Sequence, residues 1–315
     1  MSVRLGLLGV AHMHATSYAH CMTQNPQASY VGLWDAEAAR ASDFQKTYGG
    51  EVFESPEAMF PHVDAVGIAS ENVHHHDLAL RAIRAGKHVI CEKPLATTTA
   101  HAKEMVDAAR EAGVVFMTAF PCPFSPAFDK LVGRVQRGEI GKIVAICATN
   151  RGRCPGGWFI QKELSGGGAM IDHTVHVADL LYRLLGAEPE RVTAATGNNI
   201  HGGDWEDTAM VTLEYPGGVF ATLDSSWSRP AHYRTWGDVT MNVVGEKGVI
   251  EMDMFGPSVE VYTSGHASHG YGSNLDALMF DEFVAAILDK RAPKVTGEDG
   301  LRAVRVAEMA YASLG

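Results

Sequence analysis

The sequence predicts an α/β fold, in which a doubly wound parallel sheet precedes an α+β domain with a large, mostly antiparallel open sheet. In the first 120 residues, short apolar strands alternate with helical segments at the spacing of βαβ units. In the second half, strand-like segments alternate apolar and polar residues, as in an antiparallel sheet with one buried face. At 315 residues the chain is too long for one ordinary core, so two domains are expected, residues 1–120 and 121–315.

The strands of the first domain are short apolar runs that end at turn residues. The first runs straight into a turn at Gly9, and two helices close with the C-cap glycines Gly86 and Gly113. The expected strands are Val3–Leu8, Tyr30–Trp34, Asp64–Ala69, Lys87–Cys91 and Val114–Ala119. A helix is expected after Gly9 as far as about Met22, with others over Ala36–Thr47, Val73–Ala85 and Thr97–Ala112. The alternation predicts a Rossmann-like doubly wound parallel sheet.

The second domain begins after Pro121-Cys122-Pro123, where the pattern changes. In Thr208–Tyr215, for example, Ala209, Val211 and Leu213 share one face. The expected strands are Lys142–Thr149, Thr208–Tyr215, Val219–Trp227 and Val239–Val244, and the expected helices are Pro126–Arg137, Ala169–Leu185, Leu275–Leu288 and Gly300–Ser313.

Composition limits the classes of partner. The formal net charge of −11 argues against nucleic acid and anionic membrane surfaces, because both would repel the chain. No apolar run approaches the roughly 18 residues of a membrane span. The five cysteines are scattered and odd in number, without a paired metal spacing, so we expect reduced thiols and a cytoplasmic protein.

The turn after the first strand is where a dinucleotide pyrophosphate would bind, on backbone N–H groups at a helix N-terminus. The standard fingerprint is G-x-G-x-x-G, and this chain has Gly9-Val10-Ala11-His12-Met13-His14, with only the first glycine. A purely structural tight turn is therefore the alternative.

Asp35 strengthens the dinucleotide interpretation. A carboxylate at the end of the second strand can accept hydrogen bonds from both ribose hydroxyls and would repel a 2′-phosphate. No arginine follows before Arg40, so NAD is favoured over NADP. Asp35 could also cap the next helix, and the two roles can coexist.

Two further segments carry candidate catalytic groups. Pro94 ends the Lys87–Cys91 strand and leaves Lys93 at its carboxyl end, where ligands bind in open α/β sheets. Gly166-Gly167-Gly168 precedes Asp172 and His176, which lie four apart and share a helix face. A solvated lysine and an ordinary surface pair are the alternatives if each feature is taken alone.

In this order and separation, these residues resemble the glucose–fructose oxidoreductase / inositol 2-dehydrogenase / MocA (Gfo/Idh/MocA) family. The resemblance covers essentially the whole chain and includes Asn72-Val73-His74-His75, which is similar to the family's N-x-x-H segment. It implies an NAD(P)-binding Rossmann domain and a domain for substrate binding and oligomerisation. Family members mostly oxidise or reduce a secondary alcohol of a sugar, inositol or related polyol, and commonly form homodimers or homotetramers through the open face of the large sheet.

The resemblance and the spacing assign His176 as acid/base, with Asp172 bonding a second substrate hydroxyl or orienting His176. Lys93 would stabilise the developing alkoxide. The cofactor-binding candidates are Gly9, Ala11, His12, Met13, Asp35, Ser70, Asn72, His75, Glu92 and Lys93.

Departures from the family pattern bear on affinity and substrate. Ala11 and His14 replace glycines and bear on cofactor affinity, and Glu71 stands where proline is frequent. Thr174 stands where glycine is common and Pro123 where arginine is typical, which suggests a substrate unlike inositol or glucose.

Other residues suggest sites without fixing them. Trp158 and Phe159 could stack on a sugar ring, and Arg151 and Arg153 could bind a carboxylate or phosphate, although a structural role is the alternative for each. Seven histidines, with Asp172 or Glu71, could hold Zn²⁺, but no motif fixes a geometry and no metal site is assigned. These are His12, His14, His74, His75, His76, His173 and His176.

Three functions follow. The first is NAD-dependent oxidation or reduction of a carbohydrate or polyol. The second is a hydrolase, lyase or epimerase that retains NAD and oxidises its substrate transiently. The third is a non-catalytic ligand sensor, which the incomplete glycine turn permits but which has no need of Lys93, Asp172 and His176 together.

Overall fold

The computed structural model describes residues 2–233, 235–256, 258–262, 266–270 and 272–315. The chain forms two compact units. The first comprises Met1–Pro121, Glu163–Gly166 and Leu275–Val304, and the second comprises Cys122–Lys162, Gly167–Asn274 and Arg305–Gly315. Two segments that follow residue 121 therefore pack with the N-terminal part of the chain. The functional division into residues 1–120 and 121–315 stays a prediction.

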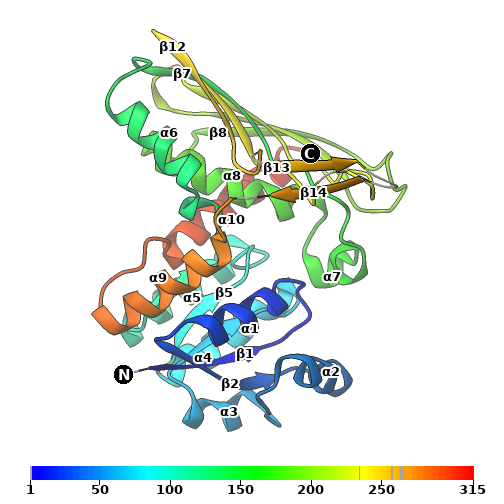
Figure 1. Cartoon of the computed structure of the whole chain (residues 1–315). Coiled ribbons are helices and arrows are strands. Elements are labelled where there is room, and N and C mark those ends of the chain that lie inside the picture. The colour runs from blue at the N-terminus through cyan, green and yellow to red at the C-terminus, as the bar shows by residue number, and fades with distance from the viewer. Residues whose placement is uncertain (1, 234, 257, 263–265, 271) are drawn as a thin grey trace. The chain divides into compact units, whose positions relative to one another are not determined.

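The first unit contains the predicted parallel sheet, which is confirmed (Figure 1). Its strand order, β3-β2-β1-β4-β5-β6, reverses direction between β1 and β4. Ligands of open α/β sheets bind at such a reversal, beyond the carboxyl ends of the strands. The strands are β1 (Val3–Leu8), β2 (Ala28–Trp34), β3 (Glu51–Val52), β4 (Ala65–Ile68), β5 (His88–Cys91) and β6 (Phe116–Thr118).

The helices of this unit begin and end where caps are available. The Thr98 hydroxyl accepts the His101 N–H, and Gly113 ends the same helix in the left-handed region. The helices are α1 (Ala15–Gln24), α2 (Ala38–Tyr48), α3 (Pro56–Met59), α4 (His75–Arg84), α5 (Thr99–Ala112) and α9 (Leu275–Asp289), with 3₁₀ turns η1 (Phe60–His62) and η2 (Asn72–His74). Helix α7 (Lys162–Ser165) and helix α10 (Gly297–Ala312) contribute residues to both units.

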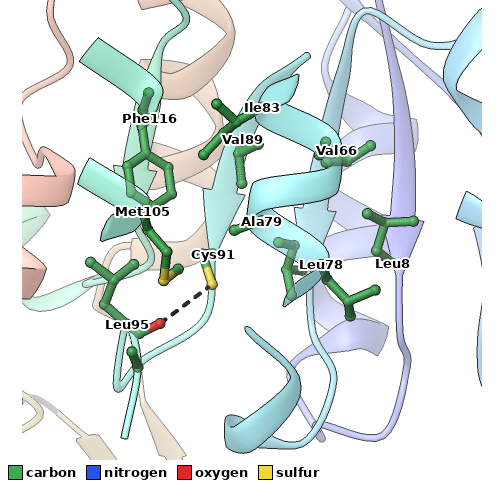
Figure 2. Close-up of a cluster of buried hydrophobic side chains, with 14 of the residues drawn as sticks. Leu8, Val66, Leu78, Ala79, Ile83, Val89, Cys91, Leu95, Met105 and Phe116 are labelled. Carbon is green, nitrogen blue, oxygen red and sulfur yellow. Dashed lines mark hydrogen bonds between the residues drawn. The ribbon is translucent and has the colours of Figure 1, made fainter. Parts of the chain in front are cut away.

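One core layer of the first unit lies between the sheet and helices α4 and α5. Figure 2 shows Val66 and Val89 from the strands beside Leu78 and Ile83 from α4, with Met105 from α5. Burying each such side chain contributes about 1.5–3 kcal/mol. This packing fixes the carboxyl ends of β4 and β5, where the candidate residues lie.

The second unit contains a six-stranded sheet in the order β12-β11-β7-β10-β9-β8. It is antiparallel as predicted, except that β10 runs parallel to β7. Its strands are β7 (Ile143–Thr149), β8 (Arg191–Gly197), β9 (Thr208–Glu214), β10 (Phe220–Asp224), β11 (Thr240–Gly245) and β12 (Gly248–Asp253), and β13 (Ser258–Tyr262) pairs with β14 (His266–Gly270). The helical segments are α6 (Pro126–Gln136), α8 (Ala169–Leu185), η3 (Cys122–Phe124), η4 (Gly157–Ile160) and η5 (Pro216–Gly218).

One face of this sheet is buried and the other is open. Ala209, Val211 and Leu213 are buried, and helix α8 packs against this face, where Thr174 donates to Ser225 at 3.2 Å. On the open face, Met210 is 55% exposed. The sheet therefore places the first turns of α8 beside the ends of β9 and β10.

No helix among the described residues is long and apolar enough to cross a membrane.

Candidate active site

The turn after β1 depends on the glycine at position 9. Gly9 has φ +78°, and a Cβ there would lie 2.5 Å from the Cβ and 2.7 Å from the Cα of Ser70, which follows β4. The turn and the end of β4 are therefore in contact at the reversal of strand order. The adjoining N–H groups serve internal bonds: Val10 donates to Asp35 at 2.7 Å and His12 to the Ala69 carbonyl at 2.9 Å.

Asp35 is buried at the end of β2, and its carboxylate is surrounded by donors. The Val10 N–H donates to Oδ2 and the Glu37 N–H to Oδ1 at 2.8 Å, and Arg40 donates from Nε to both oxygens at 3.0 Å. A carboxylate has about four lone-pair sites, so ribose hydroxyls would have to replace part of this set. The prediction that Asp35 caps the next helix is wrong, because the N-cap of α2 is Glu37 and no side chain caps that helix; Asp35 instead accepts the N–H of Glu37.

Arg40 is closer to Asp35 than its distance along the sequence indicates. Five positions beyond Asp35, helix α2 returns its guanidinium group to the carboxylate, and Nη2 also lies 3.1 Å from Glu71. Burial alone would lower the pKa of Arg40, but the bonds to Asp35 and the charge of Glu71 raise it. Glu71, which replaces a frequent proline, thus belongs to this ion-pair network. The network borders a cavity of about 90 Å³, whose walls include Gly9, Asp35, Arg40, Ser70, Glu71 and Asp77.

His12, His14 and Glu92 form a second buried cluster, which we name the His12/His14/Glu92 cluster. Nδ1 of His14 is 2.9 Å and Nδ1 of His12 is 3.6 Å from Oε1 of Glu92, and the Tyr18 hydroxyl also donates to Oε1. The room that a third glycine would leave is thus filled by the imidazole of His14, whose ring centroid is 4.5 Å from that of His12.

The electrostatics of Glu92 follow from this cluster. Burial alone would raise the pKa of its carboxyl group, but His12, His14 and Lys93 together lower it well below the usual range. Glu92 is therefore ionised at neutral pH. For His14, burial alone would lower the pKa, but the charge of Glu92 and the hydrogen bond to it outweigh burial, so the pKa is raised.

Lys93 follows Glu92 at the carboxyl end of β5, as predicted, and its side chain is buried. Two other candidates support the backbone nearby. The His75 ring contacts the Pro94 carbonyl at 2.9 Å and the Ser70 carbonyl at 3.3 Å, and burial lowers its pKa. Asn72 donates to the Ser165 carbonyl at 2.8 Å. His75 thus supports the segment that carries Lys93.

In the second unit, Asp172 and His176 lie on α8, the helix that was predicted over the same residues. The Asp172 carboxylate accepts the Trp227 indole N–H at 3.0 Å and lies 3.3 Å from Nε2 of His173. Trp227 lies 55 positions from Asp172 and outside α8, so no spacing in the sequence connects the two residues. A contact between Asp172 and His176 stays a prediction.

The glycines before α8 allow a close approach of chain segments. Gly168 donates to Oε1 of Glu206 at 2.8 Å, and Tyr311 donates to the same oxygen at 2.5 Å. A Cβ at Gly168 would overlap the Glu206 carbonyl, and one at Gly167 would overlap the Tyr311 hydroxyl. The glycine run is therefore required by packing, and it fixes the start of the helix that carries Asp172.

Aromatic rings gather beside Asp172. Trp158 and Phe159 stack with centroids 3.9 Å apart, and Trp205 meets Trp227 edge-on at 5.4 Å. Phe159, Trp205 and Trp227 belong to one buried cluster, against which Trp158 packs. The predicted stacking platform is thus tied to the packing of this unit.

The other residues singled out in this unit have structural partners. Arg151 is paired with Asp238 at 3.0 Å, and Arg153 donates to the Tyr233 carbonyl. Thr174, which departs from the family pattern, is fully buried and faces the sheet. Its identity is therefore explained by helix–sheet packing.

Two family models match the chain. One, described as an oxidoreductase family with an NAD-binding Rossmann fold, matches residues 3–120, and the other, the GFO/IDH/MocA C-terminal domain, matches residues 128–251. The chain is 30% identical over 312 residues to the 1,5-anhydro-D-fructose reductase of Ensifer adhaerens, with 95% of this chain and 92% of the relative covered.

Two other relatives extend the comparison. The 2,7-anhydro-N-acetylneuraminate hydratase of Escherichia coli is 34% identical over 280 residues, which are 85% of this chain and 72% of the relative. The crystal structure of GenD2 from gentamicin A biosynthesis, in complex with NAD, superposes with a TM-score of 0.91 at 26% identity, covering 99% of this chain and 94% of that one.

Because Gly9 is in close contact with Ser70, adding one methyl group at position 9 is expected to reduce the stability of the protein more than at an ordinary turn glycine. We expect Gly9→Ala to lower the free energy of unfolding by about 2–4 kcal/mol, since it adds overpacking to the strain of a positive φ. Gly86→Ala is the matched control, because Gly86 has φ +71° but nothing within 4 Å of the added Cβ, so only about 1 kcal/mol is expected. Urea unfolding measures both, and equal losses would contradict the assigned contact.

Proposed function

The chain belongs to the Gfo/Idh/MocA family of NAD-binding oxidoreductases, and we propose that it transfers hydride between a nicotinamide and a secondary alcohol of a sugar, inositol or related polyol. The observation that carries the proposal is the position of Lys93, a buried lysine at the carboxyl end of β5. In the same sheet, the order of the strands reverses between β1 and β4, the neighbour of β5. A buried cation there suits an oxygen that gains negative charge as hydride leaves carbon.

We propose a role for each of the three catalytic candidates. His176 acts as acid/base, because imidazole can exchange the hydroxyl proton in both directions near neutral pH. Asp172 binds a second substrate hydroxyl, and the indole N–H of Trp227 would hold its carboxylate in place. Lys93 stabilises the alkoxide. NAD, when bound, supplies the hydride acceptor.

The cofactor set is proposed as Gly9, Ala11, His12, Met13, Asp35, Ser70, Asn72, His75, Glu92 and Lys93. We propose NAD as the preferred cofactor, with NADP disfavoured. The cavity beside Gly9 has three carboxylates in its walls, Asp35, Glu71 and Asp77, and Arg40 is already paired with two of them. A 2′-phosphate would therefore meet a cation whose charge is neutralised.

A second function is favoured by one comparison, the relative named as a hydratase. In that alternative, NAD stays bound and oxidises the substrate transiently. NADH would not accumulate, but a substrate C–H group would exchange with solvent deuterium.

We also propose that the protein forms a homodimer or homotetramer through the open face of the second unit's sheet. Met210, Phe220 and Val249 project there from β9, β10 and β12 and are 55%, 45% and 53% exposed. Phe220 and Val249 lie level with each other across β7 and β11, whereas Met210 lies opposite Asp224 at the other end of β10. Large exposed apolar side chains on one sheet face are typical of a surface that another chain covers. The five cysteines are free, and we propose the cytoplasm as compartment.

Catalysis is tested with a panel of sugars and polyols, measured by NADH formation and by solvent deuterium exchange. Lys93→Met and His176→Ala are each expected to lower kcat by about 10²–10⁴-fold, because each removes a group that acts on the reacting oxygen. Lys87→Met, at the other end of β5, is the matched control and should retain activity. Tight NAD binding without turnover or exchange across the panel would contradict the proposal.

Cofactor preference is tested by titrating the protein with NADH and NADPH and following nicotinamide fluorescence. The wild type should bind NADH more tightly. Asp35→Ser should weaken NADH binding by about tenfold and strengthen NADPH binding, because Arg40 is released to pair with the phosphate. Asp35→Ser combined with Arg40→Ala should lose that gain. Equal binding of both cofactors by the wild type would show that Asp35 does not discriminate.

The oligomer is tested by light scattering on size-exclusion chromatography. Phe220→Arg should reduce the assembled mass, because a buried arginine without a partner costs several kcal/mol at an interface. Val52→Arg, at the edge of the other sheet, is the control and should leave the mass unchanged. A monomeric wild type would rule out the proposed interface.

A further inference from the structure

The His12/His14/Glu92 cluster contains three metal-binding side chains within the first unit. One donor atom from each lies within 4.8 Å of the others. The side chains of His12 and Glu92 are 1% and 0% exposed, whereas that of His14 is 35% exposed. Two imidazoles and a carboxylate form a donor set that binds divalent transition metals, and His14 offers an ion a path from solvent.

The separations of the donors fit a small coordination sphere. Zn–N distances of about 2.0–2.1 Å and Zn–O distances of about 2.0–2.2 Å place neighbouring tetrahedral donors about 3.4 Å apart. The two separations to Oε1 of Glu92, 2.9 Å from Nδ1 of His14 and 3.6 Å from Nδ1 of His12, bracket that value. The third pair, the two imidazole donors, lies within 4.8 Å, so the rings would turn toward a common ion to complete the sphere.

An ion would replace some of the present hydrogen bonds and keep others. Nδ1 of His12 now accepts the His14 backbone N–H at 3.1 Å, a bond that coordination through this atom would replace. The Tyr18 hydroxyl and the Lys93 backbone N–H both donate to the Glu92 carboxylate, the latter at 3.0 Å. The Lys93 bond, which goes to Oε2, can remain as an outer contact, whereas the Tyr18 hydroxyl shares Oε1 with the two imidazoles and competes with the ion for that oxygen.

The chemistry of the donors selects the kind of ion. Mg²⁺ and Ca²⁺ prefer all-oxygen ligand sets, whereas imidazole suits first-row transition metals. The nearby charge of Lys93 opposes any cation, so an ion that gains strongly from coordination is required. We propose that the His12/His14/Glu92 cluster binds a divalent transition-metal ion, with Zn²⁺ the expected occupant. The ion joins the β1–α1 turn to the end of β5.

The test measures metal in untagged protein that has been treated with a chelator and then dialysed against Zn²⁺ or Co²⁺. We expect one equivalent of Zn²⁺ per chain by elemental analysis, and a visible absorption band when Co²⁺ enters a tetrahedral nitrogen–oxygen site. His14→Ala should weaken Co²⁺ binding by at least tenfold. Tyr18→Phe removes the hydroxyl that shares Oε1 and should bind Co²⁺ at least as tightly as the wild type.

His76→Ala is the matched control, because Nε2 of His76 also lies 2.8 Å from a carboxylate, that of Glu104, at the protein surface. It should leave the binding unchanged. A wild type without the Co²⁺ band, or equal loss of metal in His14→Ala and His76→Ala, would overturn the proposal. If His14→Ala does not fold, weaker binding by Tyr18→Phe would overturn it instead. Metal content and Co²⁺ absorption do not depend on hydride transfer. The experiment therefore distinguishes a failure of the proposed metal site from a failure of the proposed function.

Discussion

The ionised carboxylate of Glu92 is the constraint on which the candidate site of the first unit depends. An unpaired carboxylate in a protein interior costs several kcal/mol, so it must be surrounded by donors and positive charge. Here these come from the turn after β1, from helix α1 and from the backbone of Lys93. Satisfying one buried charge therefore fixes three segments relative to one another, and it holds the segment that carries the candidate catalytic lysine.

The same physical logic operates at the end of β2. Asp35 receives bonds from the turn, from the start of α2 and from Arg40, and Arg40 also reaches Glu71. The cofactor turn has lost two of the three glycines that give the backbone close access to a pyrophosphate. The turn is held instead by two buried carboxylates: Asp35 bonds Val10, and Glu92 bonds His14. His14, which stands where the fingerprint has its third glycine, is thus itself one of the side chains that hold the turn.

Much of the fold could be predicted from periodicity, and the reasons for the exceptions are physical. Helix α8 was predicted over its observed range because a long amphipathic run ends at Gly186. Strands β8 and β12 were missed because Arg191–Gly197 and Gly248–Asp253 are mixed in polarity and lie at the sheet edges. Contacts such as Trp227 with Asp172 depend on tertiary packing, which one sequence read without homologues does not specify.

Helix α9 returns from the end of the chain to pack beside α1, where Phe280 lies against the Tyr18 ring at 4.8 Å and Asp276 accepts the Ser17 hydroxyl. Tyr18 in turn donates to Glu92. During synthesis, residues 275–289 must therefore leave the ribosome before the first unit can close its own core. A fragment that stops near residue 121 would leave the outer side of α1 uncovered. Residues 1–121 are thus not a separable module, although they contain the whole parallel sheet.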